Sequence, residues 1–198
     1  MSWTIAAFGA VTKLGNLAIL VPLSGVMLGW QLALRPKGAA WSWLAACLVC
    51  AGGIGLLKIL LYACLPYSEL RSPSGHTSLS TLVYGGFVAV IAADLGAWRR
   101  WFTIGVGAAL VAAIAVSRVV IHAHSWLEVL LGLAVGVSCL LAFALLYLPR
   151  RGDTVPMKTF AVIVLVIWVL LYSHPVNAEG LIHRISDVLG IRALVCHG

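Results

Sequence analysis

Hydrophobic residues dominate almost the whole chain and are interrupted only by short polar segments. Apolar stretches of about twenty residues recur along it, and a helix needs this length to cross a bilayer. Pro22 lies inside the first stretch, where a membrane helix tolerates a kink. We therefore expect an all-α, polytopic membrane protein with six transmembrane helices in one bundle. The predicted spans are residues 14–34, 40–65, 77–95, 101–121, 126–148 and 155–172.

The two ends of the chain lie outside these spans. Residues 2–13 are predicted either as an interfacial helix or as an extension of the first span. In the tail, residues 173–198, apolar residues recur at helical spacing among charged ones, which predicts a short amphipathic helix on the membrane or over the site. We find no repeat, no linker and no cleavable signal peptide. Residues 1–198 are therefore expected to form a single membrane-embedded domain.

Composition and charge agree with this class of protein. Hydrophobic residues make up 62% of the chain and charged residues 10%, whereas a soluble domain carries about a quarter charged residues. The net charge is +7, but the basic residues stand singly or in pairs at the ends of apolar runs and form no patch. We therefore expect the lipid bilayer as a partner and no nucleic acid. The oligomeric state stays open.

The basic residues also predict the orientation. Those in the loops after the first, third and fifth spans define the cytoplasmic side by the positive-inside rule. They are Arg35, Lys37, Arg99, Arg100, Arg150 and Arg151. The loops after the second and fourth spans then lie on the outer side. Polar residues converge on that side. Polar groups avoid the bilayer unless they have a function, so this convergence indicates a functional role.

The segment Arg71-Ser-Pro-Ser-Gly-His76 directly precedes the third predicted span. Ser74 and Gly75 are expected at a helix N-terminus, where free backbone amides and the helix dipole favour an anion. An ordinary N-cap formed by Ser74 or Thr77 is the alternative interpretation.

A second polar group follows the fourth span. His124 and Glu128 are four residues apart and share a helical face, so the carboxylate can fix the imidazole tautomer and make the other nitrogen a better nucleophile or base. Arg118 supplies a planar guanidinium suited to phosphate. A membrane-interface cluster is the alternative. His122 is interpreted as an interface or supporting histidine, because position 126 holds Trp126 instead of a carboxylate.

The five cysteines form no metal-binding pattern. Cys47 and Cys50 lie within an apolar run and are expected to be small core- or lipid-facing residues. Cys64 and Cys196 are both predicted on the outer side, where an oxidising compartment would allow a disulfide. We expect two unpaired thiols and keep the disulfide as the alternative.

Pro73-Ser74-Gly75-His76, followed by Ser117-Arg118, five residues, His124, three residues and Glu128, resembles the type 2 phosphatidic acid phosphatase family. That family also includes glucose-6-phosphatase and the vanadium haloperoxidases. Two positions depart from its pattern. Its first motif is Lys, six residues and Arg-Pro, whereas Lys58 is followed here by Leu65-Pro66, and Arg71 is a candidate replacement. Its third motif ends in Asp, and Glu128 stands in that place.

The resemblance implies a metal-independent phosphatase without a cofactor. His124 would attack phosphorus, and Glu128 would orient the imidazole of His124. His76 would protonate the leaving oxygen and then activate water. The implied phosphate-binding residues are Lys58, Arg118, Ser74, Gly75 and Arg71. It also implies a bacterial cell inner (plasma) membrane, with the active site facing the periplasm or outside.

The expected substrate is an amphiphilic lipid phosphate or diphosphate. Candidates are a polyprenyl diphosphate such as undecaprenyl diphosphate, phosphatidic acid, phosphatidylglycerol phosphate and lipid A. A lipid-to-lipid phosphotransferase remains as an alternative, because a phosphoenzyme can pass its phosphate to another lipid instead of water. A non-catalytic lipid-phosphate-binding protein also remains, because of the two departures from the family pattern.

Overall fold

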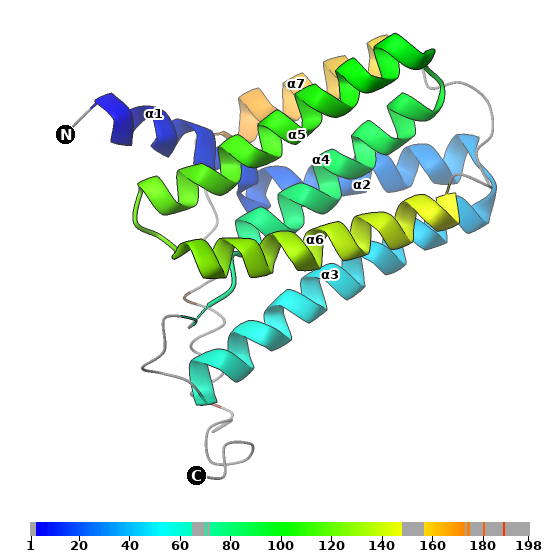
Figure 1. The fold of residues 1–198 in the computed structure, drawn as a ribbon. Helices are drawn as coiled ribbons and strands as arrows, with labels where there is room; N and C mark the ends of the chain where they lie inside the picture. Colours follow the sequence, from blue (N-terminus) through cyan, green and yellow to red (C-terminus); the bar gives the residue numbers. More distant parts are fainter. Residues whose placement is uncertain are drawn as a thin grey trace.

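A computed structural model describes residues 3–64, 72–147 and 157–172, together with positions 70, 174, 180 and 188. Within this part of the chain the regular elements are helices, and there is no strand. In chain order they are α1 (Trp3–Thr12), a 3-10 turn η1 (Lys13–Gly15), α2 (Leu17–Leu34), α3 (Lys37–Cys64), α4 (Gly75–Ala93), α5 (Ala97–Val120), α6 (Trp126–Tyr147) and α7 (Met157–Leu171) (Figure 1).

Five of the six predicted spans correspond to helical segments that are long and apolar enough to cross a membrane. These segments are Trp3–Leu34, Lys37–Cys64, Gly75–Ala93, Ala97–Val120 and Trp126–Tyr147. The predicted sixth span coincides with α7, which has 15 residues. A helix of that length extends about 22 Å, less than the ~30 Å of a hydrocarbon core. The all-α multi-pass architecture is confirmed, and the sixth span is helical but short.

The N-terminal residues form a helix of their own. Asn16 has extended backbone geometry with ψ 145°, and its Oδ1 accepts a hydrogen bond from Ala18 N at 2.9 Å, so it caps α2. This cap separates α2 from η1 and α1. No residue of α1 is buried, and Trp3 is 92% exposed. Helix α1 projects from one end of the bundle and packs against α5 (Figure 1).

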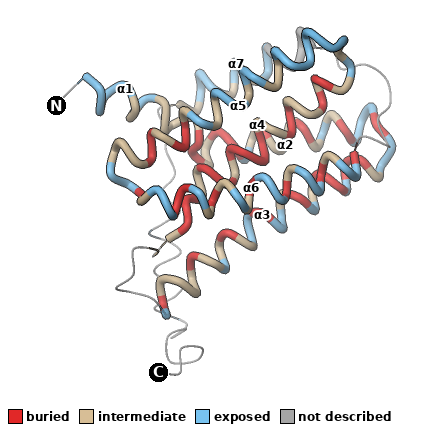
Figure 2. Tube along the Cα trace, viewed as in Figure 1, coloured by how far each residue is buried: buried red, intermediate tan, exposed pale blue. Residues whose placement is uncertain are grey.

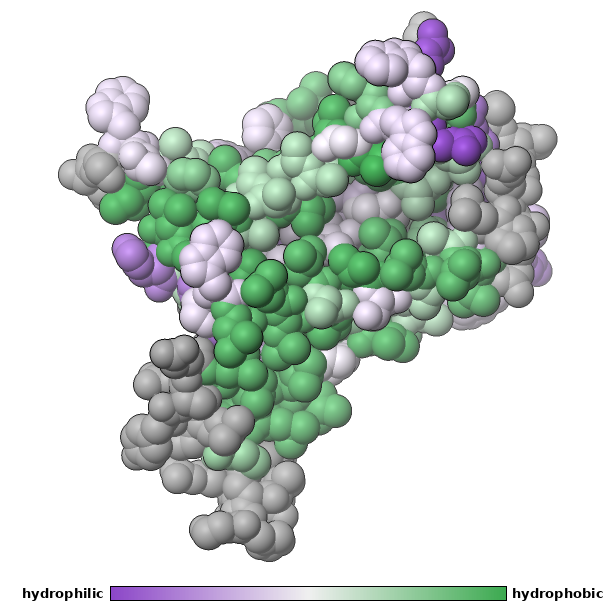
Figure 3. Space-filling view, in the orientation of Figure 1, coloured by the Kyte–Doolittle hydropathy of each residue, from purple (hydrophilic) through white to green (hydrophobic). Residues whose placement is uncertain are grey.

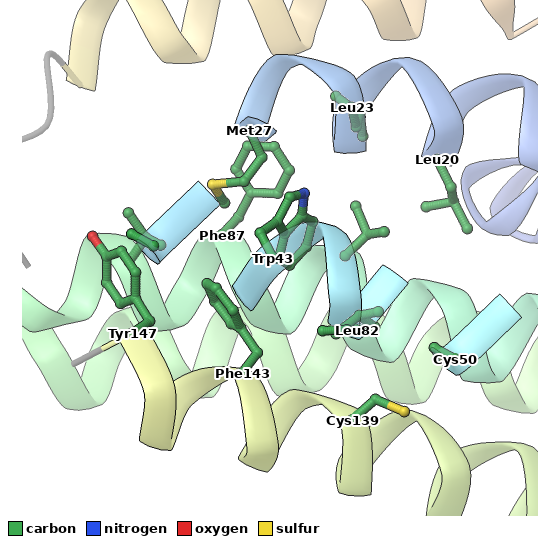
Figure 4. Packing of buried hydrophobic residues seen from close by; sticks show 14 of the residues in the cluster. Leu20, Leu23, Met27, Trp43, Cys50, Leu82, Phe87, Cys139, Phe143 and Tyr147 are labelled. Atoms are coloured by element: carbon green, nitrogen blue, oxygen red, sulfur yellow. The ribbon is translucent and has the colours of Figure 1, made fainter. Parts of the chain in front are cut away.

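Helix α4 lies in the middle of the bundle, and buried residues are dense along it (Figure 2). It packs against α5 and α6, and less extensively against α3 and α2. The core beside it contains Trp43 of α3 and Phe143 and Tyr147 of α6 (Figure 4). The Trp43 and Phe143 rings meet edge to face at a centroid distance of 4.9 Å. The surface of the bundle is hydrophobic over its middle, with the most hydrophilic residues near its ends (Figure 3).

The polar segments predicted to converge do lie at one end of the bundle. The end of α3, the start of α4 and the α5–α6 connection meet there, beside α1 (Figure 1). The turns from α2 to α3 and from α4 to α5 lie at the opposite end. Arg35 and Asp94 join these two turns through an ion pair of 3.7 Å between Nη2 and Oδ2.

The cysteines differ from expectation at one position. Cys47, Cys50 and Cys139 are free, and Cys50 is fully buried in the core, as predicted. Cys64 at the end of α3 is disulfide-bonded, so the expected unpaired thiol is wrong for this residue. Cys196 lies outside the described residues, as do Leu65, Pro66, Arg71 and most of the tail.

Candidate active site

Lys58 reaches the site from the last two turns of α3. Its side chain is largely buried, and its Nζ donates a hydrogen bond of 2.7 Å to the Ser72 hydroxyl. A Cβ placed on Gly75 would lie 3.5 Å from Lys58 Cε, so the lysine side chain runs beside the first residue of α4. A buried cation is thereby held next to a helix N-terminus, where the helix dipole adds further positive potential.

Ser74 is the N-cap of α4, and it is fully buried. Its Oγ accepts hydrogen bonds from Thr77 N at 3.4 Å and from the Thr77 hydroxyl at 3.0 Å. The structure therefore bears out the N-cap interpretation for Ser74. A hydroxyl has two acceptor positions and one proton. Since both contacts use Ser74 Oγ as acceptor, this geometry is compatible with donation of its own proton to an anion.

His76 follows in the first turn of α4 and is half-buried. Its ring lies against η1, because a Cβ on Gly15 would be 3.3 Å from His76 Cβ and Cδ2. The N-terminal segment thus forms one wall beside this histidine.

Arg118 lies in the last turn of α5 and is mostly buried. Its Nη1 donates a hydrogen bond of 3.1 Å to the Thr12 hydroxyl at the end of α1. Its backbone carbonyl accepts from Ala123 N at 3.0 Å and from His124 N at 3.1 Å. The turn that follows passes through His122, which has a positive φ of 55° and is exposed. Arg118 therefore anchors the loop that carries His124.

The pair of His124 and Glu128 forms as predicted. His124 Nδ1 and Glu128 Oε2 are 3.0 Å apart, and both residues are largely buried. Glu128 Oε2 also accepts from Ser125 N at 3.1 Å, while Ser125 Oγ accepts from Glu128 N at 3.2 Å. This reciprocal pair is a capping box at the start of α6.

The other carboxylate oxygen of Glu128 reaches across to the segment before α4. Glu128 Oε1 accepts from Ser72 N at 2.7 Å, and the Glu128 backbone carbonyl accepts from Ser74 N at 3.0 Å. One residue thus holds the α4 N-terminus against the histidine loop. The extra methylene of glutamate is accommodated without loss of the contact to His124.

Close packing of α4 on α6 supports these bonds. A Cβ on Gly132 would overlap the Ser74 carbonyl oxygen, and a Cβ on Gly136 would be 2.5 Å from the Ser78 carbonyl oxygen. The two glycines let the backbones approach as membrane helices do at small residues. The start of α4 is therefore seated directly on the first turns of α6.

Most sequence-predicted site residues are thus gathered at one end of the bundle, and Arg71 lies outside the described residues. Three contributors were not predicted, namely Thr12, Ser72 and Ser125. For Ser125 a signal existed, because Ser-x-x-Glu before an apolar run marks a capping box. Thr12 carries no such signal, since its partner Arg118 lies 106 residues away.

The fold and this site define a multi-pass helical membrane protein with a buried histidine–carboxylate pair beside a cationic helix N-terminus. The PAP2 superfamily model matches residues 56–153, which include Lys58, the start of α4, Arg118, His124 and Glu128. The chain therefore contains a PAP2 superfamily domain at residues 56–153, within a multi-pass helical membrane protein. It is also similar to an "Uncharacterized 22.5 kDa protein in cps region" of Klebsiella pneumoniae, with 28% identity over 96% of this chain and 92% of the relative. The comparison with solved structures found no match.

Proposed function

We propose that the protein hydrolyses a lipid phosphate or polyprenyl diphosphate through a phosphohistidine on His124. The observation that carries this proposal is the 3.0 Å contact of His124 Nδ1 with Glu128. A carboxylate on Nδ1 fixes the tautomer and stabilises the imidazolium that forms, which makes Nε2 the attacking atom. Membership of the PAP2 superfamily supports phosphatase chemistry.

The first step forms a bond between His124 Nε2 and phosphorus and breaks the bond from phosphorus to the lipid oxygen. His76 protonates that oxygen as it leaves. In the second step His76 accepts a proton from water, the water oxygen bonds to phosphorus, and the bond to Nε2 breaks. Inorganic phosphate is released in this second step, and the group that leaves in the first step is the lipid alcohol, or the lipid monophosphate if the substrate is a diphosphate.

Fixed positive groups would stabilise the charge that develops on the phosphoryl oxygens. Lys58 and Arg118 supply two buried cations, and the α4 N-terminus supplies Gly75 N–H and the Ser74 hydroxyl. Arg71 keeps its proposed role as the replacement for the first-motif arginine.

The proposed orientation places this site on the periplasmic or outer face of the cell inner membrane. Arg35, Lys37, Arg99 and Arg100 lie in or beside the turns at the opposite end of the bundle, and basic residues favour the cytoplasmic side.

The test is release of phosphate from a panel of lipid phosphates and diphosphates by detergent-solubilised protein in EDTA. Wild type is expected to release phosphate, and His124→Ala is expected to fall to background. His122→Asn is the matched control, because His122 is exposed, lies two residues from His124 and has a positive φ that asparagine tolerates, so this variant should keep its rate within about twofold. Equal release by wild type and His124→Ala would contradict the phosphohistidine. Lipid binding without release by any variant would favour the non-catalytic alternative.

A further inference from the structure

A long groove runs between α5 and α6, with α4 as its floor. Its volume is about 750 Å³. It exists because α4 packs along both neighbours, whereas α5 and α6 have far fewer contacts with each other. In the view of Figures 1 and 3, α5 and α6 border it on two sides and α4 lies between them.

The lining of the groove suits a hydrocarbon. Among the described residues that line it, the polar side chains are those of Thr81 and Arg100. The Thr81 hydroxyl already donates to Thr77 O at 2.6 Å, so it adds little polarity. Small residues on α5, including Ala108 and Ala112, keep the space open, and leucine and valine side chains of α6 form the opposite wall.

The groove begins directly beneath the candidate active site. Ala115 lines it three residues before Arg118, Thr81 lines it five residues after His76, and Leu133 lines it five residues after Glu128. All three helices therefore lead from the site residues into the groove within about one and a half turns.

The opposite end of the groove lies at Arg100, in the first turn of α5. The 15 residues from Arg100 to Ala115 span about 22 Å along the helix, compared with ~30 Å for the whole hydrocarbon core. A chain that starts at the site could thus follow the groove for most of one bilayer thickness.

We propose that this groove holds one hydrocarbon chain of the lipid substrate and selects for its length, an inference that rests on the proposed function. The chain would lie on α4 between α5 and α6, with its phosphate at His124. The bilayer already solvates such a chain, so the groove contributes positioning rather than water exclusion. A bulky side chain near the site should therefore exclude all but short hydrocarbon chains, whereas one deeper in the groove should exclude only longer chains.

The test compares Ala112→Phe and Ala108→Phe on single-chain alkyl phosphates of increasing length. Ala112 is about 4.5 Å and Ala108 about 10 Å below Ala115 along α5. Each phenylalanine is expected to lower kcat/KM at least tenfold for alkyl chains long enough to reach it. One misfitting group in an apolar pocket discriminates by about 10- to 200-fold. Ala112→Phe should act at shorter chain lengths than Ala108→Phe.

Two controls keep the result interpretable. Ala109→Phe makes the same change at an exposed residue of α5 that does not line the groove, and it should leave the length dependence unchanged. A short, water-soluble alkyl phosphate should be cleaved at rates within about twofold by all variants, which reports intact folding and chemistry. The proposal would be overturned if Ala112→Phe, Ala108→Phe and Ala109→Phe all showed the same dependence of kcat/KM on alkyl chain length.

A second measurement does not require turnover. Wild-type protein is photolabelled with an alkyl phosphate that carries a diazirine along its chain, and the labelled residues are mapped. Label on α4, α5 and α6 that excess unlabelled alkyl phosphate removes is expected, even if no phosphate is released. Equal labelling by the matching alcohol would overturn the proposal, because the groove would then take any bilayer chain.

Discussion

At the scale of single residues, Glu128 shows how a glutamate fits where the resembled family has aspartate. Its carboxylate closes a capping box with Ser125, contacts His124 and accepts the Ser72 amide. The N3 position of a capping box favours Glu or Gln, whose length lets the side chain fold back over the first turn. One longer side chain therefore combines helix capping with orientation of the histidine.

Substitutions at Glu128 are expected to rank by what they preserve. Glu128→Asp keeps the charge but is too short for all three contacts, so we expect kcat to fall about tenfold, the cost of one lost charge-assisted hydrogen bond. Glu128→Gln keeps the length but loses the charge, and it should lower kcat by about 10²- to 10⁴-fold because the imidazolium is no longer stabilised. Steady-state phosphate release measures both. A Gln variant faster than the Asp variant would contradict the role of the carboxylate.

At the scale of elements, the site depends on how closely α4 approaches α6. Gly132→Ala places a methyl group against the Ser74 carbonyl, which belongs to backbone and cannot rotate away. We expect a loss of about 1–3 kcal/mol in the free energy of unfolding and a clear fall in activity, because the start of α4 must shift from Glu128. Thermal unfolding in detergent and phosphate release measure the two effects.

Gly105 of α5 provides the matched control for Gly132. A Cβ there meets nothing within 4 Å. Gly105→Ala should raise the free energy of unfolding by about 0.5–1 kcal/mol through helix propensity and leave activity unchanged. Similar losses in both variants would mean that a changed contact with lipid, rather than the Ser74 contact, sets the cost.

Helix α1 contacts the candidate site through the Thr12 side chain. Thr12→Val removes the hydroxyl that accepts from Arg118 Nη1 while keeping the shape of the residue. A hydrogen bond to a charged group contributes about 1.5–3 kcal/mol, so we expect kcat/KM to fall about tenfold or more. Thr12→Ser should retain most of the activity. If valine and serine behave alike, α1 acts by packing and not by orienting Arg118.

At the scale of the whole molecule, the Arg35–Asp94 pair fastens the end of the bundle opposite the site. The Arg35 side chain is fully buried, whereas that of Asp94 is 20% exposed. Asp94→Asn leaves a buried guanidinium without its counter-charge, so we expect a loss of about 2 kcal/mol in the free energy of unfolding, reduced from the fully buried case by the exposure of Asp94. Thermal unfolding measures the loss, and kcat/KM on a short alkyl phosphate should be unchanged. A fall in kcat/KM without a fall in stability would instead indicate coupling between the two ends.

Much of this arrangement could be predicted from the sequence because hydropathy alone locates membrane helices. The five long spans and the His124–Glu128 pair follow from local spacing. The break at Asn16 was left open, since it depends on one side chain that caps α2 within an apolar run. The contact of Thr12 with Arg118 and the link from Glu128 to Ser72 depend on tertiary packing across more than fifty residues, which no local pattern encodes.

The link from Glu128 to Ser72 also bears on biosynthesis. Glu128 enters the membrane with the last of the five long helices, although its partner Ser72 left the ribosome 56 residues earlier. Until α6 is inserted, the segment before α4 lacks the acceptor that holds it and His124 has no carboxylate. The proposed phosphate chemistry can therefore begin only once insertion has reached α6, and chains that end before α6 are expected to be inert toward the lipids around them.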